Sequence, residues 1–150
     1  MEEGRTMRKK AFAGLVVFVF LSSLLFLAPR MVAQEQEQQQ VSKLPISWDN
    51  WREAKASAEK YDAEGDYTRA LQYYLEYIRQ AEGLGRLDIA AWGKNNAAYM
   101  IIKQHKQDSS TDLAPAKKLL EEGLAISEAT EDCKLKLQSN LEYVKMFIRD

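Results

Sequence analysis

Few side chains in this sequence are of a type and spacing that could do chemistry. The single histidine, His105, stands among Lys103, Lys106 and Gln107, with no acid or nucleophile spaced to make it a general base. The single cysteine, Cys133, falls in the first turn of a predicted helix, where the helix dipole could lower its pKa. A dimer disulfide is the other chemical use of this cysteine. A half-buried structural thiol is favoured over both.

The carboxylates do not form a catalytic pair either. Glu121 and Glu122, like Glu131 and Asp132, are adjacent in sequence, so the two side chains of each pair diverge on a helix. No glycine-rich phosphate loop, metal-ligand spacing or G-x-S-x-G motif occurs. The sequence therefore predicts a protein that is not an enzyme, with no catalytic residues, no metal and no cofactor.

The charge balance argues against a nucleic-acid partner. Lys and Arg number 21 and Asp and Glu 22, which gives a formal net charge of -1 over 150 residues. No excess of positive charge is present to hold a phosphate backbone. The length suits one domain of ordinary size.

The N-terminal segment has the pattern of an export signal. Four basic residues between Arg5 and Lys10 precede 18 uncharged residues, Ala11 to Ala28. We expect residues 1–33 to be a signal peptide, with Ala33 before the cut, or else an uncleaved membrane anchor, because 18 apolar residues approach the span of a bilayer. The remainder is then exported across the cytoplasmic membrane to the periplasm or the medium, and touches the membrane only through this segment.

Composition changes twice after the apolar run. Residues 34–47 begin with Gln and Glu and contain a proline, so they predict a flexible linker. From residue 48 to residue 150 apolar residues recur at helical spacing, most clearly from Tyr67 to Ala81, and no strand-length alternation is present. We predict an all-α domain of antiparallel helix hairpins. The expected helices cover about 50–64, 67–83, 87–103, 113–124 and 131–148, with Asn50, Asp66 and Asp112 as caps for the first, second and fourth.

One segment carries a family resemblance. A tyrosine is followed by a Gly-Asp-Tyr turn, an alanine at the helix contact and an aromatic on the second helix, at Tyr61, Gly65, Asp66, Tyr67, Ala70 and Tyr74. Asn95 to Tyr99 is echoed 44 residues later by Ser139 to Tyr143. This pattern resembles the tetratricopeptide repeat. The resemblance covers about residues 50–148 and implies a short α-solenoid of about two repeats plus a C-terminal capping helix.

The resemblance also implies a binding surface. In that family the first helix of each repeat lines a concave face that holds a protein or peptide. The residues implied here are Arg52, Lys55, Glu59, Trp92, Asn95, Tyr99, Lys103, Lys136 and Tyr143. The leading hypothesis is an exported scaffold or adaptor that binds a partner protein of the envelope or medium through this surface.

Two alternatives stay open from the sequence. The first is a membrane-anchored structural subunit that forms a homo-oligomer, because a solenoid this short needs a neighbour to complete its core. The second is a small-ligand carrier that uses the aromatic residues and would show a closed cavity.

Overall fold

The computed structural model describes residues 44–148, and every regular element in that range is an α-helix. The helices are α2 (Trp48–Ala63), α3 (Tyr67–Gly83), α4 (Leu87–Gln107), α5 (Ala114–Leu124) and α6 (Glu131–Lys145). The prediction of an all-α domain is confirmed. The predicted signal peptide or anchor, its cut after Ala33 and the linker up to residue 43 lie outside the described residues. Among the helices described, none combines the length and apolar character needed to cross a membrane.

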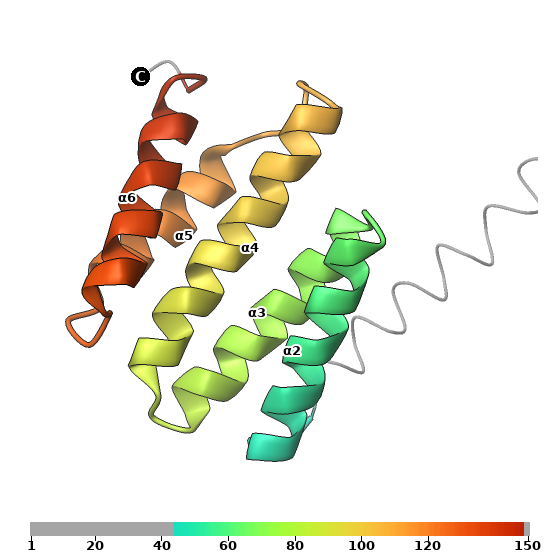
Figure 1. Ribbon diagram of the computed structural model, residues 1–150, viewed down its shortest axis with the longest axis vertical. Helices are drawn as coiled ribbons and strands as arrows, with labels where there is room; N and C mark the ends of the chain where they lie inside the picture. The colour runs from blue at the N-terminus through green and yellow to red at the C-terminus, as the bar shows by residue number, and fades with distance from the viewer. Residues whose placement is uncertain (1–43, 149–150) are drawn as a thin grey trace, which may run out of the picture. The chain divides into compact units, whose positions relative to one another are not determined.

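Helix α4 is the centre of the array. In Figure 1 it runs between α2 and α3 on one side and α5 and α6 on the other. It packs against α3, α5 and α6, while α2 packs against α3 and α5 against α6. Each helix therefore lies beside its neighbour in sequence, and the contact between α4 and α6 joins helices that are not consecutive.

Two glycines make the turns that reverse the chain. Gly65 and Gly85 have φ values of 77° and 70°, a conformation that a side chain disfavours. After α2 the Asp66 N–H donates to the Tyr61 carbonyl at 2.9 Å, and after α3 the Arg86 N–H donates to the Ala81 carbonyl at 2.9 Å. The α2–α3 and α3–α4 connections thus use the same helix-ending turn.

The apolar side chains form two clusters, and α4 contributes to both. One cluster fills the space between α2, α3 and α4 and consists of Ala54, Ala58, Ala70, Tyr74, Tyr77, Ile78, Ala97 and Met100. The other joins α4 to α5 and α6 and consists of Ala91, Ala98, Ile101, Ile102, Leu113, Ala116, Leu120, Ala129, Cys133, Leu137, Leu141 and Val144. Because opposite faces of α4 are covered, its position fixes both halves of the domain.

Glycine also allows two helix pairs to approach closely. A Cβ on Gly93 of α4 would lie 2.7 Å from side-chain atoms of Tyr77 and Ile78 on α3. A Cβ on Gly123 of α5 would lie 2.7 Å from Leu137 on α6. Both contacts lie well inside van der Waals distance, so a side chain at either position requires the neighbouring helix to shift.

The helix ends differ from the sequence expectation in four places, and one of them is the end of α6, at Lys145 instead of about residue 148. α2 begins at Trp48, because Ser47 is the cap and its Oγ accepts from the Asn50 N–H at 3.1 Å. α4 continues to Gln107, one turn beyond the expected end. Asp112 accepts from the Ala114 N–H at 2.9 Å, but it stands one residue before the cap position of α5.

The apolar stripe predicted on α3 needs one correction at its centre. The residues at helical spacing are Tyr67, Ala70, Leu71, Tyr74, Leu75, Ile78 and Ala81. Leu75 is 46% exposed, whereas Tyr77, which the stripe omits, is 6% exposed. Tyr77 faces Trp51 of α2, with ring centroids 5.3 Å apart. Helix α3 is covered by two neighbours, so its buried face is broader than a single period predicts.

Candidate functional site

The three predicted binding residues of α2 are exposed and bonded locally. The Arg52 guanidinium lies 2.9 Å from Asp49, one turn earlier. The Lys55 ammonium lies 2.9 Å from Glu59, one turn later. Their charges are neutralised within the helix, and exposed pairs of this kind contribute little to stability.

Asn95 is buried and holds α6 against α4. Its side chain is 7% exposed, and its Oδ1 accepts from Asn140 Nδ2 of α6 at 2.9 Å. Its own Nδ2 donates to Asn96 Oδ1 at 3.2 Å. The Asn95 side-chain amide is thus engaged in a hydrogen bond that joins α4 to α6. The sequence prediction omitted Asn140, although the echo of Asn95 to Tyr99 at residues 139–143 was the available signal.

Tyr99, Lys103 and Tyr143 come together with two residues that the sequence prediction omitted. Lys106 Nζ lies 5.9 Å from the Tyr99 ring centroid and 4.9 Å from that of Tyr143. Lys103 Nζ lies 5.0 Å from the Tyr99 centroid, and the Tyr143 and Phe147 centroids are 5.0 Å apart. We call these five residues the aromatic–lysine surface.

This surface carries a positive charge that no carboxylate among residues 44–148 neutralises. Lys103 pairs with Asp62, at the end of α2, at 2.5 Å. Within residues 44–148, Lys106 has no carboxylate within 4 Å. Its ammonium is attracted instead by the faces of two rings. Tyr99 and Phe147 are 37% and 51% exposed, so aromatic area and cation are offered to solvent together.

The remaining predicted residues lie outside this group. Trp92 is half-buried against the cluster formed by α4, α5 and α6. Lys136 is exposed on α6. No contact in the described part of the chain joins either of them, or the α2 residues Arg52, Lys55 and Glu59, to the aromatic–lysine surface.

His105 and Cys133, the two side chains that could take part in chemistry, are held in place by packing and hydrogen bonding. His105 Nδ1 is 3.0 Å from the Thr111 carbonyl, and its ring meets Phe147 edge to face at 5.2 Å. Cys133 is free and 0% exposed, and burial raises its pKa to about 11. The helix-dipole activation considered from sequence is therefore wrong for this thiol. The loss of hydration of the buried thiolate raises the pKa more than the helix dipole lowers it.

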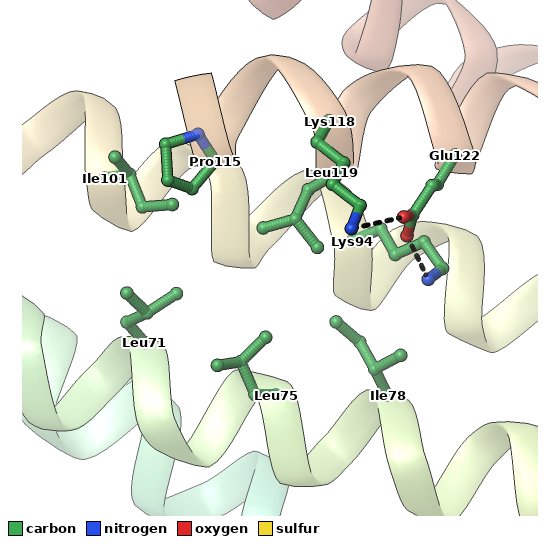
Figure 2. A pocket seen from close by; sticks show the side chains of 9 residues that line it. All are labelled: Leu71, Leu75, Ile78, Lys94, Ile101, Pro115, Lys118, Leu119 and Glu122. Atoms are coloured by element: carbon green, nitrogen blue, oxygen red, sulfur yellow. Dashed lines mark hydrogen bonds and ion pairs between the residues drawn. The ribbon is translucent and has the colours of Figure 1, made fainter. Parts of the chain in front are cut away.

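A groove opens on α4 between α3 and α5. It encloses about 400 Å³, and Figure 2 shows its side chains converging from the three helices. The lining residues are Leu71, Leu75, Ile78, Lys94, Ile101, Pro115, Lys118, Leu119 and Glu122. Leu75 is 46% exposed. The groove is thus open to solvent and differs from the closed cavity expected of a small-ligand carrier.

Lys94 closes one end of this groove by bridging two helices. Its Nζ lies 2.9 Å from Glu122 on α5 and 3.2 Å from Glu82 on α3. Partial burial alone would lower the pKa of Lys94, but the hydrogen bond to Glu122 and the charge of Glu82 together raise it. The ammonium therefore stays charged and ties α3, α4 and α5 together.

The described residues contain no group of three or more His, Cys, Asp or Glu side chains that could hold a metal ion. Neither models of protein families, nor curated proteins, nor solved structures gave a match to this chain. What the arrangement offers chemically is an exposed surface of rings and ammonium groups, together with an open apolar groove.

Proposed function

We propose that this protein is a non-enzymatic, exported scaffold or adaptor of tetratricopeptide type, located in the periplasm or envelope, that holds a segment of a partner protein. The observation that carries the proposal is the position of Lys106, an exposed ammonium between the rings of Tyr99 and Tyr143 without a carboxylate partner among residues 44–148. Aromatic rings with few rotatable bonds are enriched at the centre of protein-binding surfaces, and the neighbouring ammonium adds attraction for a negatively charged group.

The helix packing supports the solenoid part of the proposal. The same glycine turn follows α2 and α3, and the contact between α4 and α6 is of the kind that links equivalent helices of successive repeats. On this reading α2, α4 and α6 are the first helices of their units, and α6 is the cap. The aromatic–lysine surface then belongs to the helices that line the concave face.

The geometry also assigns different roles to the residues implied by the resemblance. Asn95 is a positioning residue, because its amide is buried and bonded to Asn140. Tyr99, Lys103, Lys106, Tyr143 and Phe147 are the binding residues. Their chemistry favours a segment with acidic and apolar side chains, since carboxylates meet the ammonium groups and apolar groups meet the rings.

The test is a cross-linked capture from the envelope fraction with the full chain as bait. The variant carries Tyr99→Ala and Lys106→Ala. A matched control carries Leu135→Ala and Lys118→Ala, which also removes one exposed large side chain and one exposed lysine, away from the surface. We expect one protein to be captured by the parent and the control and lost, by tenfold or more, with the variant.

The same experiment separates the alternative of a membrane-anchored, self-associating subunit. If parent, variant and control each recover only further copies of the bait, self-assembly is the better account and the aromatic–lysine surface is not the binding site. Equal capture of one partner by all three baits would also overturn the proposed surface. Circular dichroism of each bait establishes that the helices are intact.

A further inference from the structure

The four residues before α2 lie against α3 instead of extending into solvent. We call Leu44 to Ser47 the strap. The strap is bonded at three backbone atoms to two consecutive side chains of α3, Arg79 and Gln80. The partners are 33 to 35 residues apart in sequence, so these are tertiary contacts that nothing in the linker-like composition of the strap requires.

A buried carboxylate holds the two α3 side chains in place. Glu76 is 4% exposed, and its two oxygens accept from Arg79 Nε at 2.7 Å and Arg79 NH2 at 2.6 Å. Glu76 Oε1 also accepts from Gln80 Nε2 at 2.8 Å. A buried carboxylate is tolerated only when it is paired and hydrogen-bonded. Glu76, Arg79 and Gln80 thus form one rigid unit, which we call the clamp.

The clamp bonds to the backbone of the strap. Arg79 NH2 donates to the Leu44 carbonyl at 2.6 Å, and Gln80 Nε2 donates to the Pro45 carbonyl at 3.0 Å. Gln80 Oε1 accepts from the Ser47 N–H at 2.8 Å, so this one amide bonds the strap through both its donor and its acceptor. Pro45 suits its position because it has no N–H that would need a partner, and its carbonyl also accepts from Asn50 Nδ2 at 2.7 Å.

One side chain of the strap also docks on α3. Ile46 lies over Gly83, where a Cβ would come within 2.7 Å of the Ile46 Cδ1 atom. Glycine is costly near the end of a helix relative to alanine. Here its missing side chain makes room for Ile46.

We propose that the Glu76–Arg79–Gln80 clamp is an intramolecular binding site for an extended segment, and that its occupant, the strap, anchors the chain where residues 1–43 join the helical domain. Residues 44–47, which the sequence assigned to the flexible linker, are therefore part of the folded domain. Ser47 is at once the last residue of the strap and the cap of α2, so the anchor also protects the first turn of α2.

The anchor has a consequence for the whole chain. Ser47 and Asp62 are separated by about 22 Å along α2, at 1.5 Å per residue. Asp62 pairs with Lys103 of the aromatic–lysine surface. The chain therefore enters the domain at the opposite end of α2 from that surface.

The test is hydrogen exchange of the full chain, read at the amides of Ser47, Asn50 and Trp51. Gly83→Ala places a methyl group where Ile46 lies and leaves the clamp and the core untouched. Arg79→Ala removes one arm of the clamp. The matched control is Arg69→Ala, which removes another half-buried arginine of α3 that is bonded to a carboxylate, here Asp66, at the opposite end of the helix from the strap.

We expect both test variants to accelerate exchange at these three amides by tenfold or more, with α4, α5 and α6 unchanged and with no effect in the control. Unchanged exchange in both variants would overturn the proposal. Arg79→Ala leaves Glu76 without its cation and can loosen the whole domain. In that case Gly83→Ala decides, because alanine favours the helix and leaves Glu76 paired.

Discussion

At the scale of single residues, burial determines what Cys133 can do. Its thiol is fully enclosed by the cluster that joins α4 to α5 and α6. We predict that thiol reagents label it only after unfolding. The native chain is treated at pH 8 with a disulfide reagent, and the absorbance of the thiolate that the reagent releases measures the rate of labelling. Rapid labelling in the native state would show that the last helix opens.

The same burial gives a pH dependence with a definite sign. The pKa of Cys133 is raised from 9.0 to about 11, so the folded state holds its proton more strongly than the unfolded state. The contribution to stability is full below pH 9 and is lost as the pH rises through 11. A shift of this size corresponds to about 3 kcal/mol at most. Between pH 8 and pH 11, the free energy of unfolding measured with urea should fall more steeply for the parent than for Cys133→Ala. Parallel curves would contradict the assignment.

At the scale of the helices, the close approach of α3 and α4 depends on Gly93. We predict that Gly93→Ala lowers the free energy of unfolding by about 1–3 kcal/mol, because the added methyl group meets Tyr77 and Ile78 inside the core. Urea unfolding measures the change. Gly83→Ala is the matched control, since its methyl group meets Ile46 of the strap and not the core, and the helix preference of alanine offsets most of the lost strap contact, so we expect a change within about 0.5 kcal/mol. Equal effects would mean that helix propensity, and not packing, controls both positions.

How far the helices could be predicted depends on what each signal measures. Asp66 was correctly expected as a cap, because its Oδ1 accepts from the Arg69 N–H at 3.0 Å. Such capping is a local interaction between neighbours in sequence. Tyr77 and the strap were not predictable, because both depend on contacts with a different helix. The composition around Leu44 resembles that of a linker, and only Glu76, Arg79 and Gln80, more than 30 residues away, distinguish it.

The candidate surface was predictable in part for the same reason. Tyr99, Lys103 and Tyr143 were implied by the family resemblance, and the structure brings them together. Lys106 was missed because α4 continues one turn further than its apolar spacing indicates. Phe147 lies beyond the end of α6, and its contacts with Tyr143 and His105 depend on how the helices pack. Arg52, Lys55 and Glu59 of α2 were included in the predicted binding surface only because of their positions in the repeat pattern. Their local ion pairs follow from the same helix, but which cations lack a partner depends on the packing of all the helices.

At the scale of the whole molecule, the strap and the aromatic–lysine surface lie at opposite ends of α2. The N-terminal part of the chain joins the domain at the strap, and the aromatic–lysine surface is built from α4 and α6 near the end of α2. Under the proposed adaptor function, the partner binds near the end of α2 that carries Asp62, away from the strap.

Photocrosslinking from one position in α6 and one just beyond its end locates the partner. A photoreactive phenylalanine analogue replaces Phe147 in one full-length chain and Leu135 in another, two exposed apolar side chains of which only Phe147 belongs to the aromatic–lysine surface. After irradiation in the envelope fraction, we predict one adduct of constant mass from position 147 that is absent from position 135. An adduct from position 135 alone, or equal adducts between copies of the chain from both positions, would contradict the account.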